Sequence, residues 1–451
     1  MDLRELLRRP EGKTLEFKRE VDGPQPFLRT VVAFANTAGG EIVVGVDDGT
    51  ARVRGVPDSH ALGERLASLV TDSIEPRVLP DLETHDFRGR AVLVVRVHPS
   101  DARPHCLRAE GAERGTYVRV GSTNRRADAS LREEMARYAR GESFDERPVP
   151  DLDSEVIDFR VASELFRDHR RLRRPDLVTL RLLTRHQSRL VPTVGGVLLL
   201  GNREAEHFPD ARLQVGRFDG VDRSHIADHQ TITGTLPSLV YDAVAFVEKH
   251  ALRSVRVRRV RHDEHWSVPP VAVREAIVNA VVHADYAQPG APLRVAIFDD
   301  RIEIENPGLL PFGLTVDDLP LGTSKVRNRV IARVFHELRL IEQWGSGIQR
   351  MIAACRGAGL AAPRFEEIGT RFRATIPTVR VSAPVVDDVE RRILSFLAHD
   401  GGRATHEVAN HIGLSARATR TRLAALVDRG LVRELGTGPQ DPRRRYVLAA
   451  G

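Results

Sequence analysis

Hydrophobic residues recur along this chain with either the spacing of a β-strand or the spacing of an α-helix. Changes from one spacing to the other divide the chain into four segments. Residues 15–20 alternate apolar and polar side chains as a half-buried strand does, whereas residues 25–37 repeat apolar side chains at helical spacing and end at Gly39-Gly40. Further strands are predicted at residues 41–46, 91–99 and 116–127. The first segment, residues 1–140, is therefore predicted to be a compact α+β domain.

The second segment, residues 150–250, contains apolar runs but no residues that suggest chemistry. Residues 192–202 are interpreted as a buried strand bounded by proline and glycine, and residues 228–250 as a loop followed by a helix. The sequence has no GxxxxGK[ST] phosphate-binding loop. We therefore expect a connecting α/β region here and no helicase motor.

The third segment, residues 251–380, carries a predicted helix that begins after Pro269-Pro270. Glu275, Asn279 and His283 recur on it at i, i+4 and i+8, so their side chains share one stripe. An asparagine oxygen can ligate Mg²⁺, and a nearby glutamate can orient or deprotonate water beside a phosphate. The alternative is a buried helix whose polar stripe packs against a loop.

Three short motifs follow this helix. Residues 293–308 predict a hairpin around Asp299-Asp300 that ends at Asn306-Pro307-Gly308. A polar loop and a glycine-rich helix start come next, and both have side chains or backbone N–H groups suited to phosphate oxygens. The candidate phosphate-binding residues are Thr323, Ser324, Lys325, Gly345, Ser346 and Gly347. Taken alone, the motif Gly345-Ser346-Gly347 would favour the alternative of an ordinary glycine-rich helix start.

The fourth segment, residues 385–451, predicts three short helices and two strands. Ser415 is a suitable N-cap for the third helix, and its outward face carries Arg417, Arg420 and Thr421. The predicted wing carries Arg443, Arg444 and Arg445. The pattern is typical of a winged helix, which binds either DNA or protein. The lack of acidic residues from Ser415 to Val427 favours DNA.

The composition of the chain limits the classes of protein to which it can belong. The net charge of +6 predicts only a weak preference for polyanions. No run of eighteen apolar residues and no apolar N-terminal region is present, so we expect neither a membrane span nor a signal peptide. Cys106 and Cys355 lie far apart, which indicates a reduced, cytoplasmic protein without a zinc site. The four lysines, Lys13, Lys18, Lys249 and Lys325, are rare exceptions among many arginines.

The first segment resembles the Schlafen-type AlbA-like DNA-binding domain. The matching residues are Glu16-Phe17-Lys18, Ala33-Phe34-Ala35-Asn36-Thr37, Gly39-Gly40, Gly45-Val46-Asp47-Asp48-Gly49 and Arg119-Val120-Gly121-Ser122-Thr123. The resemblance implies binding of DNA or RNA, with Lys18, Arg119, Ser122 and Thr123 as candidate contacts. Some relatives cleave nucleic acid through carboxylates and a lysine, which makes Glu16, Lys18 and Asp47 candidate catalytic residues. The alternative is a surface ion pair and a turn-forming aspartate.

The third segment resembles the GHKL (Bergerat-fold) ATPases, in a form found in bacterial transcriptional regulators sometimes labelled RecG-related. The matching runs are REAIVNAVVHADY, RIEIENPG, TSKVRN and EQWGSGIQRM. The resemblance implies that ATP and Mg²⁺ bind here, with Asn279 as the metal ligand and Glu275 as the base for hydrolysis. It also places Asn306, His283 and Gly308 at the nucleotide. Asn306 replaces the acidic residue that usually accepts from the adenine amino group, and Ala284 replaces an arginine.

These resemblances imply a multidomain α/β (α+β) fold: an AlbA-like domain, a GHKL-type sandwich and a winged helix-turn-helix. The leading hypothesis is a cytoplasmic, dimeric transcriptional regulator in which ATP orders the 321–345 stretch as a lid and changes DNA binding. A competing hypothesis is a metal-dependent nuclease in the first domain, gated by the ATPase-like domain. In a third, that domain has lost nucleotide binding and is a dimerisation scaffold.

Overall fold

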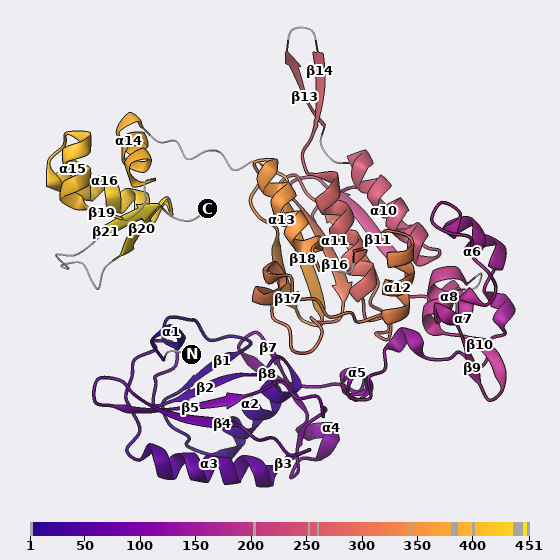
Figure 1. Ribbon diagram of the computed structural model, residues 1–451, viewed down its shortest axis with the longest axis horizontal. Coiled ribbons are helices and arrows are strands. Elements are labelled where there is room, and N and C mark those ends of the chain that lie inside the picture. Colours follow the sequence, from indigo (N-terminus) through magenta and orange to yellow (C-terminus); the bar gives the residue numbers. More distant parts are fainter. Residues whose placement is uncertain are drawn as a thin grey trace. The chain divides into compact units, whose positions relative to one another are not determined.

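In a computed structural model, the chain forms two compact units, Met1–Arg380 and Val381–Gly451, and each is described by itself (Figure 1). The structure describes residues 3–201, 204–250, 253–258, 261–342, 345–379, 387–398, 402–435 and 445–448. The further division of the first unit at residues 140, 150 and 250 stays a prediction.

The N-terminal part of the first unit is built on a four-stranded sheet. Its strands, in spatial order, are β1 (Leu15–Lys18), β2 (Gly40–Val44), β5 (Ala91–Val97) and β4 (Asp81–Asp86). Only β1 and β2 run parallel. The remaining elements are α1 (Leu3–Leu6), α2 (Pro24–Asn36), α3 (Ser59–Ser73), β3 (Ile74–Glu75), β6 (Cys106–Leu107), α4 (Gly111–Gly115), β7 (Tyr117–Val120), β8 (Thr123–Arg126) and α5 (Ala129–Ala139). The strands and helix predicted for this segment are confirmed.

A short helical region connects this part to a second sheet. It comprises η1 (Phe144–Glu146), η2 (Ser154–Val156), α6 (Phe159–Phe166), α7 (Asp176–Thr179), the hairpin β9 (Leu183–His186) and β10 (Arg189–Pro192), α8 (Val194–Leu200) and α9 (Glu204–His207). The strand predicted over residues 192–202 is wrong, because Val194–Leu200 form the helix α8. Thr193 caps this helix by accepting from the N–H of Gly196, and periodicity cannot distinguish so short a buried helix from a strand.

The second sheet has six strands. In spatial order they are β12 (Ile226–Ile232), β11 (Leu213–Phe218), β15 (Leu293–Ile297), β16 (Arg301–Pro307), β18 (Arg371–Pro377) and β17 (Arg364–Ile368). β12 occupies residues for which only a loop was expected. The hairpin predicted over residues 293–308 is confirmed as β15 and β16. A separate hairpin, β13 (Arg253–Arg258) with β14 (Arg261–Trp266), projects away from this sheet (Figure 1).

Helices cover one face of the six-stranded sheet (Figure 1). They are α10 (Leu236–His250), α11 (Pro270–His283) and α13 (Gly347–Gly357), while α12 (Arg329–Glu337) packs beside α8 and η3 (Val316–Leu321) lies near α13. Their apolar residues and those of the sheet share one large core. The sandwich of helices on one face of a mixed sheet positions the cavity described below.

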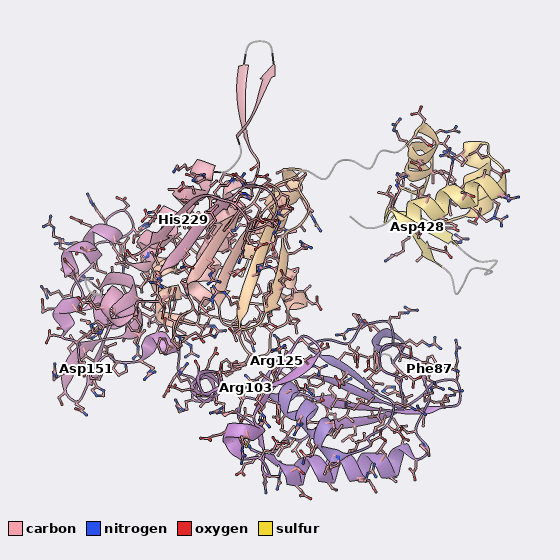
Figure 2. All side chains as sticks on the ribbon, turned by 180° about the vertical axis from the view of Figure 1, so that it is seen from behind. Phe87, Arg103, Arg125, Asp151, His229 and Asp428 are labelled. Atoms are coloured by element: carbon pink, nitrogen blue, oxygen red, sulfur yellow. The ribbon has the colours of Figure 1, made fainter. Side chains whose placement is uncertain are left out.

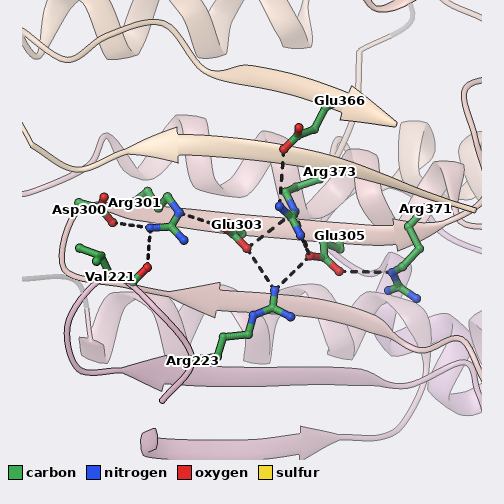
Figure 3. A network of polar contacts seen from close by, with 9 residues as sticks. All are labelled: Val221, Arg223, Asp300, Arg301, Glu303, Glu305, Glu366, Arg371 and Arg373. Carbon is green, nitrogen blue, oxygen red and sulfur yellow. Dashed lines mark hydrogen bonds and ion pairs between the residues drawn. The ribbon is translucent and has the colours of Figure 1, made fainter. Parts of the chain in front are cut away.

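The opposite face of this sheet carries charged side chains (Figure 3). Glu303 and Glu305 on β16 are buried to 6% and 5% exposure. Arg373 donates to Glu305 at 2.7 Å, and Arg223 reaches both glutamates at 3.1 and 3.2 Å. Burial alone would raise the pKa of Glu305, but the hydrogen bond and charge of Arg373 outweigh it and hold that pKa below its ordinary value. Ion pairs, rather than a second layer of helices, therefore finish this face.

The second unit is a small winged helix. It contains α14 (Asp388–Leu397), β19 (Arg403–Ala404), α15 (Thr405–Ile412), α16 (Ala416–Asp428), β20 (Val432–Leu435) and β21 (Arg445–Leu448). β20 and β21 pair antiparallel as a wing, and a small apolar core joins them to the helices. The Oγ of Ser415 accepts from the N–H of Ala418 at 3.3 Å, which confirms the predicted N-cap.

Candidate nucleotide-binding and DNA-binding sites

A cavity of about 670 Å³ lies between α11, α13 and the strands β16, β17 and β18. This volume is within the range of small-molecule and cofactor sites. The cavity brings together most of the residues that the sequence proposed for nucleotide. Those on its wall are Glu275, Asn279, His283, Asn306, Thr323, Ser324, Lys325, Gly345 and Gly347. Gly308 and Ser346 are not among the lining residues.

The sheet supplies an apolar side to this cavity. Ile304, Phe365, Phe372 and Ala374 line it, and the rings of Phe365 and Phe372 lie stacked with centroids 6.2 Å apart. Asn306 lies at the end of β16 with 4% exposure, and its side-chain amide donates to the carbonyl of Pro307 at 3.0 Å. That bond leaves the side-chain oxygen of Asn306 as an acceptor. A flat apolar wall with one acceptor at its edge suits a planar base with an amino group.

The polar stripe of α11 forms the other side. The helix begins at Pro270, and Glu275 is buried to 4% exposure. Burial raises the pKa of Glu275, an effect that the charge of Arg350 partly opposes. His283 is half-buried, and the desolvation of its ring together with the charge of Arg327 lowers its pKa to about 4. His283 is therefore neutral at physiological pH, and its Nδ1 has no hydrogen-bond partner among the described residues.

Gly308 and Gly345 have a structural reason to be glycine. Gly308 has φ +95°, and a Cβ there would lie 3.0 Å from the Cβ of Asp285. Gly345 has φ +65°, and a Cβ there would lie 2.6 Å from the carbonyl oxygen of Gly322. Left-handed backbone and close approach both favour glycine. Gly345 thus holds two loops together at the cavity, while Gly308 shapes a turn beside it.

The polar loop after η3 binds a neighbouring segment, residues 309–314, through its two cations. Lys325 donates to the carbonyl of Phe312 at 2.9 Å, and Arg327 donates to the carbonyl of Leu309. Arg327 also forms an ion pair with Glu134 on α5. The loop that holds the candidate phosphate ligands is therefore attached to the N-terminal part of the same unit.

Segment 309–314 has two sides. Leu309, Leu310, Pro311 and Leu314 line the cavity. Phe312 instead packs with Val118, Ala127 and Met135 of the N-terminal domain. The guanidinium of Arg103 (labelled in Figure 2) lies 4.8 Å from its ring centre, and the ring of Tyr138 meets it edge-on at 5.4 Å. This anchor was not predicted, because a single phenylalanine in a loop has no periodic partner.

Two polar contacts reinforce this junction. The N–H of Gly313 donates to the carbonyl of Thr37 at 2.9 Å. Glu367 on β17 accepts from Lys13 at 2.7 Å and from the N–H of Leu310 at 2.8 Å. Both side chains of the Lys13–Glu367 pair are largely buried, at 12% and 6% exposure. Segment 309–314 is thus bonded directly to Thr37 of the N-terminal domain through Gly313, and is linked to Lys13 of that domain through Glu367.

The residues proposed for nucleic acid in the N-terminal domain are placed differently from one another. Ser122 is exposed in the turn between β7 and β8, Thr123 is exposed at the start of β8, and Lys18 is half-buried. Arg119 is fully buried and donates to Glu16 at 2.6 Å, so it lies inside the domain rather than on its surface. Arg125, exposed on β8 beside that turn, was missed (Figure 2). The polar run Thr123-Asn124-Arg125-Arg126, which forms a mostly exposed strand, could have identified it.

The carboxylates among the candidate nuclease residues form ion pairs with nearby cations. Glu16 accepts from Lys18 at 2.9 Å as well as from Arg119. Asp47 pairs with Arg54 at 2.7 Å. Within the described ranges, no group of three histidine, cysteine, aspartate or glutamate side chains is arranged to hold a metal ion. This arrangement corresponds to the ion-pair alternative, and cleavage stays a prediction from sequence.

In the winged helix, Arg417, Arg420 and Thr421 are exposed on α16, whereas Thr419 and Leu423 are buried. Arg445 begins β21 and donates to the carbonyl of Gly402 at 3.2 Å. Arg443 and Arg444 lie outside the described residues. The exposed face of α16 can therefore present two guanidinium groups to phosphates or to guanine edges.

Comparison with known proteins gives three family matches. Residues 11–128 match the family described as "Schlafen, AlbA_2", residues 290–376 "Putative ATP-dependent DNA helicase recG C-terminal", and residues 386–433 "Winged helix-turn-helix DNA-binding". No curated protein sequence is significantly similar to this chain. Among the part of the chain that is described, no helix is long and apolar enough to cross a membrane.

Two solved structures are similar to parts or most of the chain. The crystal structure of the DIP2311 protein from Corynebacterium diphtheriae is 19% identical, with 97% of this chain and 95% of that chain covered and a TM-score of 0.46. The solution structure of the N-terminal domain of a RecG-related protein from Nitrosomonas europaea, titled a putative ATP-dependent DNA helicase, is 31% identical. It covers 28% of this chain and 90% of that chain, with a TM-score of 0.23.

Proposed function

We propose that this protein is a transcriptional regulator whose affinity for DNA is set by ATP. The proposal rests on the family to which the chain belongs, which joins a Schlafen AlbA_2 domain to a RecG C-terminal-type ATPase-like domain and a winged helix-turn-helix domain. Two of the three domains are of DNA-binding type, and the third is of nucleotide-binding type. What must be explained is how the nucleotide affects the DNA-binding parts.

The fit of ATP rests on the donor set of the cavity. Asn306 offers an acceptor for the adenine amino group beside the apolar wall of β17 and β18. Asn279 would hold Mg²⁺, and Thr323, Ser324 and Lys325 would hold phosphate oxygens. The start of α13 adds backbone N–H groups and the positive end of its dipole. When bound, ATP with Mg²⁺ would supply concentrated negative charge beside this loop.

One observation carries the proposed coupling: segment 309–314 is both a wall of the cavity and an anchor in the N-terminal domain. Lys325 donates to the Phe312 carbonyl at 2.9 Å. A phosphate that attracts Lys325 would compete for that bond and change how Phe312 is held. If nucleotide binds one arrangement of the segment more tightly than the other, and DNA does so as well, binding of nucleotide changes the affinity for DNA by linkage.

We expect Phe312→Ala to remove this coupling. In the unaltered protein, MgATP should change the affinity for DNA about fivefold or more. A fivefold change corresponds to a coupling free energy of about 1 kcal/mol, which is the lower end of the usual range. In Phe312→Ala the change should fall below about twofold, because the cavity wall no longer reaches the N-terminal core. Fluorescence anisotropy with duplex DNA, with and without MgATP, measures both.

The matched control is Phe218→Ala. It removes a phenyl ring that stacks on Phe298 at 5.2 Å, away from the junction, and should leave the response to MgATP intact. Calorimetry must show that Phe312→Ala still binds nucleotide. If MgATP leaves the DNA affinity of the unaltered protein unchanged, ATP does not regulate DNA binding through this segment.

The winged helix provides a second expectation. Arg417→Ala with Arg420→Ala should weaken DNA binding and lower the slope of log affinity against log salt concentration by about two, since two phosphate contacts are lost. Arg422→Ala is the control, because Arg422 lies on the same helix but pairs with Asp387. An unchanged salt slope in the double variant would indicate that this face binds protein instead.

A further inference from the structure

Arg350 on α13 holds two carboxylates at the wall of the cavity. Its Nη2 donates to Oε1 of Glu275 at 2.7 Å, and its Nη1 forms an ion pair with Glu342. Glu342 also accepts from the hydroxyl of Ser346 at 2.9 Å. The three residues join the middle of α11 to the start of α13. The spacing motifs of the sequence did not indicate this ion-pair group.

The members of this group differ in their access to solvent. The side chain of Glu275 is only 5% exposed, while those of Arg350 and Glu342 are 34% and 56% exposed. Arg350 lines the cavity, and its Nε has no hydrogen-bond partner among the described residues. A ligand in the cavity can therefore reach the Arg350 side chain, whose buried Nε has no acceptor in the described part of the chain.

One oxygen of Glu275 is engaged in this arrangement. Oε1 accepts from Arg350, and Oε2 lies near Gly347, where an added Cβ would be only 2.5 Å away. Pairing with a cation makes a carboxylate a weaker base toward water. With Arg350 in place, Glu275 is held as one partner of an ion pair.

Arg350 also lies close to where an anion is expected. Gly347 is the first residue of α13, and Arg350 is one turn further along the helix. The N-terminus of a helix attracts phosphate, and a guanidinium binds phosphate oxygens through paired N–H donors. A terminal phosphate at this helix start would thus compete directly with Glu275 for Arg350.

We propose that Arg350 recognises the terminal phosphate of a nucleoside triphosphate and releases Glu275 when it does so. The inference rests on the proposed nucleotide site and extends it to the choice between triphosphate and diphosphate. A diphosphate lacks the group that draws Arg350 away, so Glu275 stays paired. The exchange makes discrimination between ATP and ADP a property of one side chain.

The test compares the affinities of ADP and a non-hydrolysable ATP analogue for the full chain, by calorimetry with Mg²⁺. Arg350→Gln should weaken binding of the analogue about tenfold or more, a loss of about 1.4 kcal/mol, and change ADP affinity less than about threefold. Retained ADP binding also shows that the variant is folded. Arg333→Gln removes a cation from α12 in the same cavity and should weaken both nucleotides by the same factor.

A second variant tests the exchange from the other side. Glu275→Gln leaves Arg350 without its buried partner and should tighten binding of the analogue relative to ADP. If both nucleotides bind but Arg350→Gln leaves their affinity ratio unchanged, the role of Arg350 is refuted while the nucleotide site stands. If neither nucleotide binds the unaltered protein, the proposed nucleotide site fails as well.

Discussion

Replacing Asn279 by alanine is expected to weaken Mg²⁺-dependent ATP binding about a hundredfold, a loss of about 2.7 kcal/mol. Asn279 is brought onto the wall of the cavity beside the start of α13, where a Cβ on Gly347 would lie 3.6 Å from its amide nitrogen. Its side-chain oxygen is the neutral hard ligand available there for a magnesium ion that accompanies phosphates. Titration calorimetry with ATP, in Mg²⁺ and in EDTA, measures the effect.

Asn279→Asp is the matched control. It keeps an oxygen ligand of the same length, so it should retain a substantial part of the magnesium-dependent affinity. In EDTA the unaltered protein and Asn279→Ala should bind ATP about equally weakly. If Asn279→Ala binds MgATP as tightly as the unaltered protein, Asn279 is not the metal ligand, and the polar stripe of α11 only packs against its surroundings.

Replacing Arg119 by alanine is expected to destabilise the N-terminal domain by about 3–5 kcal/mol, the usual cost of removing one partner of a buried ion pair. Besides its bond to Glu16, Arg119 donates to the carbonyl of Gly12 at 3.0 Å and to Asn124 at 2.9 Å. Its removal would leave all three acceptors without this donor. Differential scanning calorimetry should show the midpoint of the unfolding transition of this domain lowered by roughly 10–20 °C.

Arg125→Ala is the comparison, because Arg125 is exposed on β8 a few residues away. It should change stability by less than about 0.5 kcal/mol while weakening nucleic-acid binding. The opposite result would favour the prediction that Arg119 contacts nucleic acid. In that case the Arg119→Ala protein would have unchanged stability but would no longer bind DNA, and the Arg125→Ala protein would still bind DNA.

The features that were predicted correctly are those encoded locally. The spacing of Glu275, Asn279 and His283 is enough to place them on one side of a helix, and the structure does place them on one cavity wall. Ser415 and the alternation in β1 likewise depend only on neighbouring residues. Residues 192–202 were misassigned for the same reason, since an apolar run with two glycines fits either a short strand or a short buried helix.

The parts that the sequence did not reveal depend on pairing between distant residues. Arg350 meets Glu275 across 75 positions, and Lys13 meets Glu367 across 354. Arg119 was proposed as a nucleic-acid contact from the family resemblance, but it is buried and pairs with Glu16, 103 positions away. Phe312 gains meaning only when the N-terminal domain is folded against it.

The outer face of the six-stranded sheet constrains how this chain can evolve. Glu303 and Glu305 are each shared by more than one arginine, so replacing a single glutamate would leave several guanidinium groups facing one another (Figure 3). A change at either position is tolerable only with a compensating change at Arg223 or Arg373. Among homologues, positions 223, 303, 305 and 373 should therefore covary. Sequences in which the four positions change together would indicate descent from a common ancestor with this sheet, even where the cavity residues have diverged.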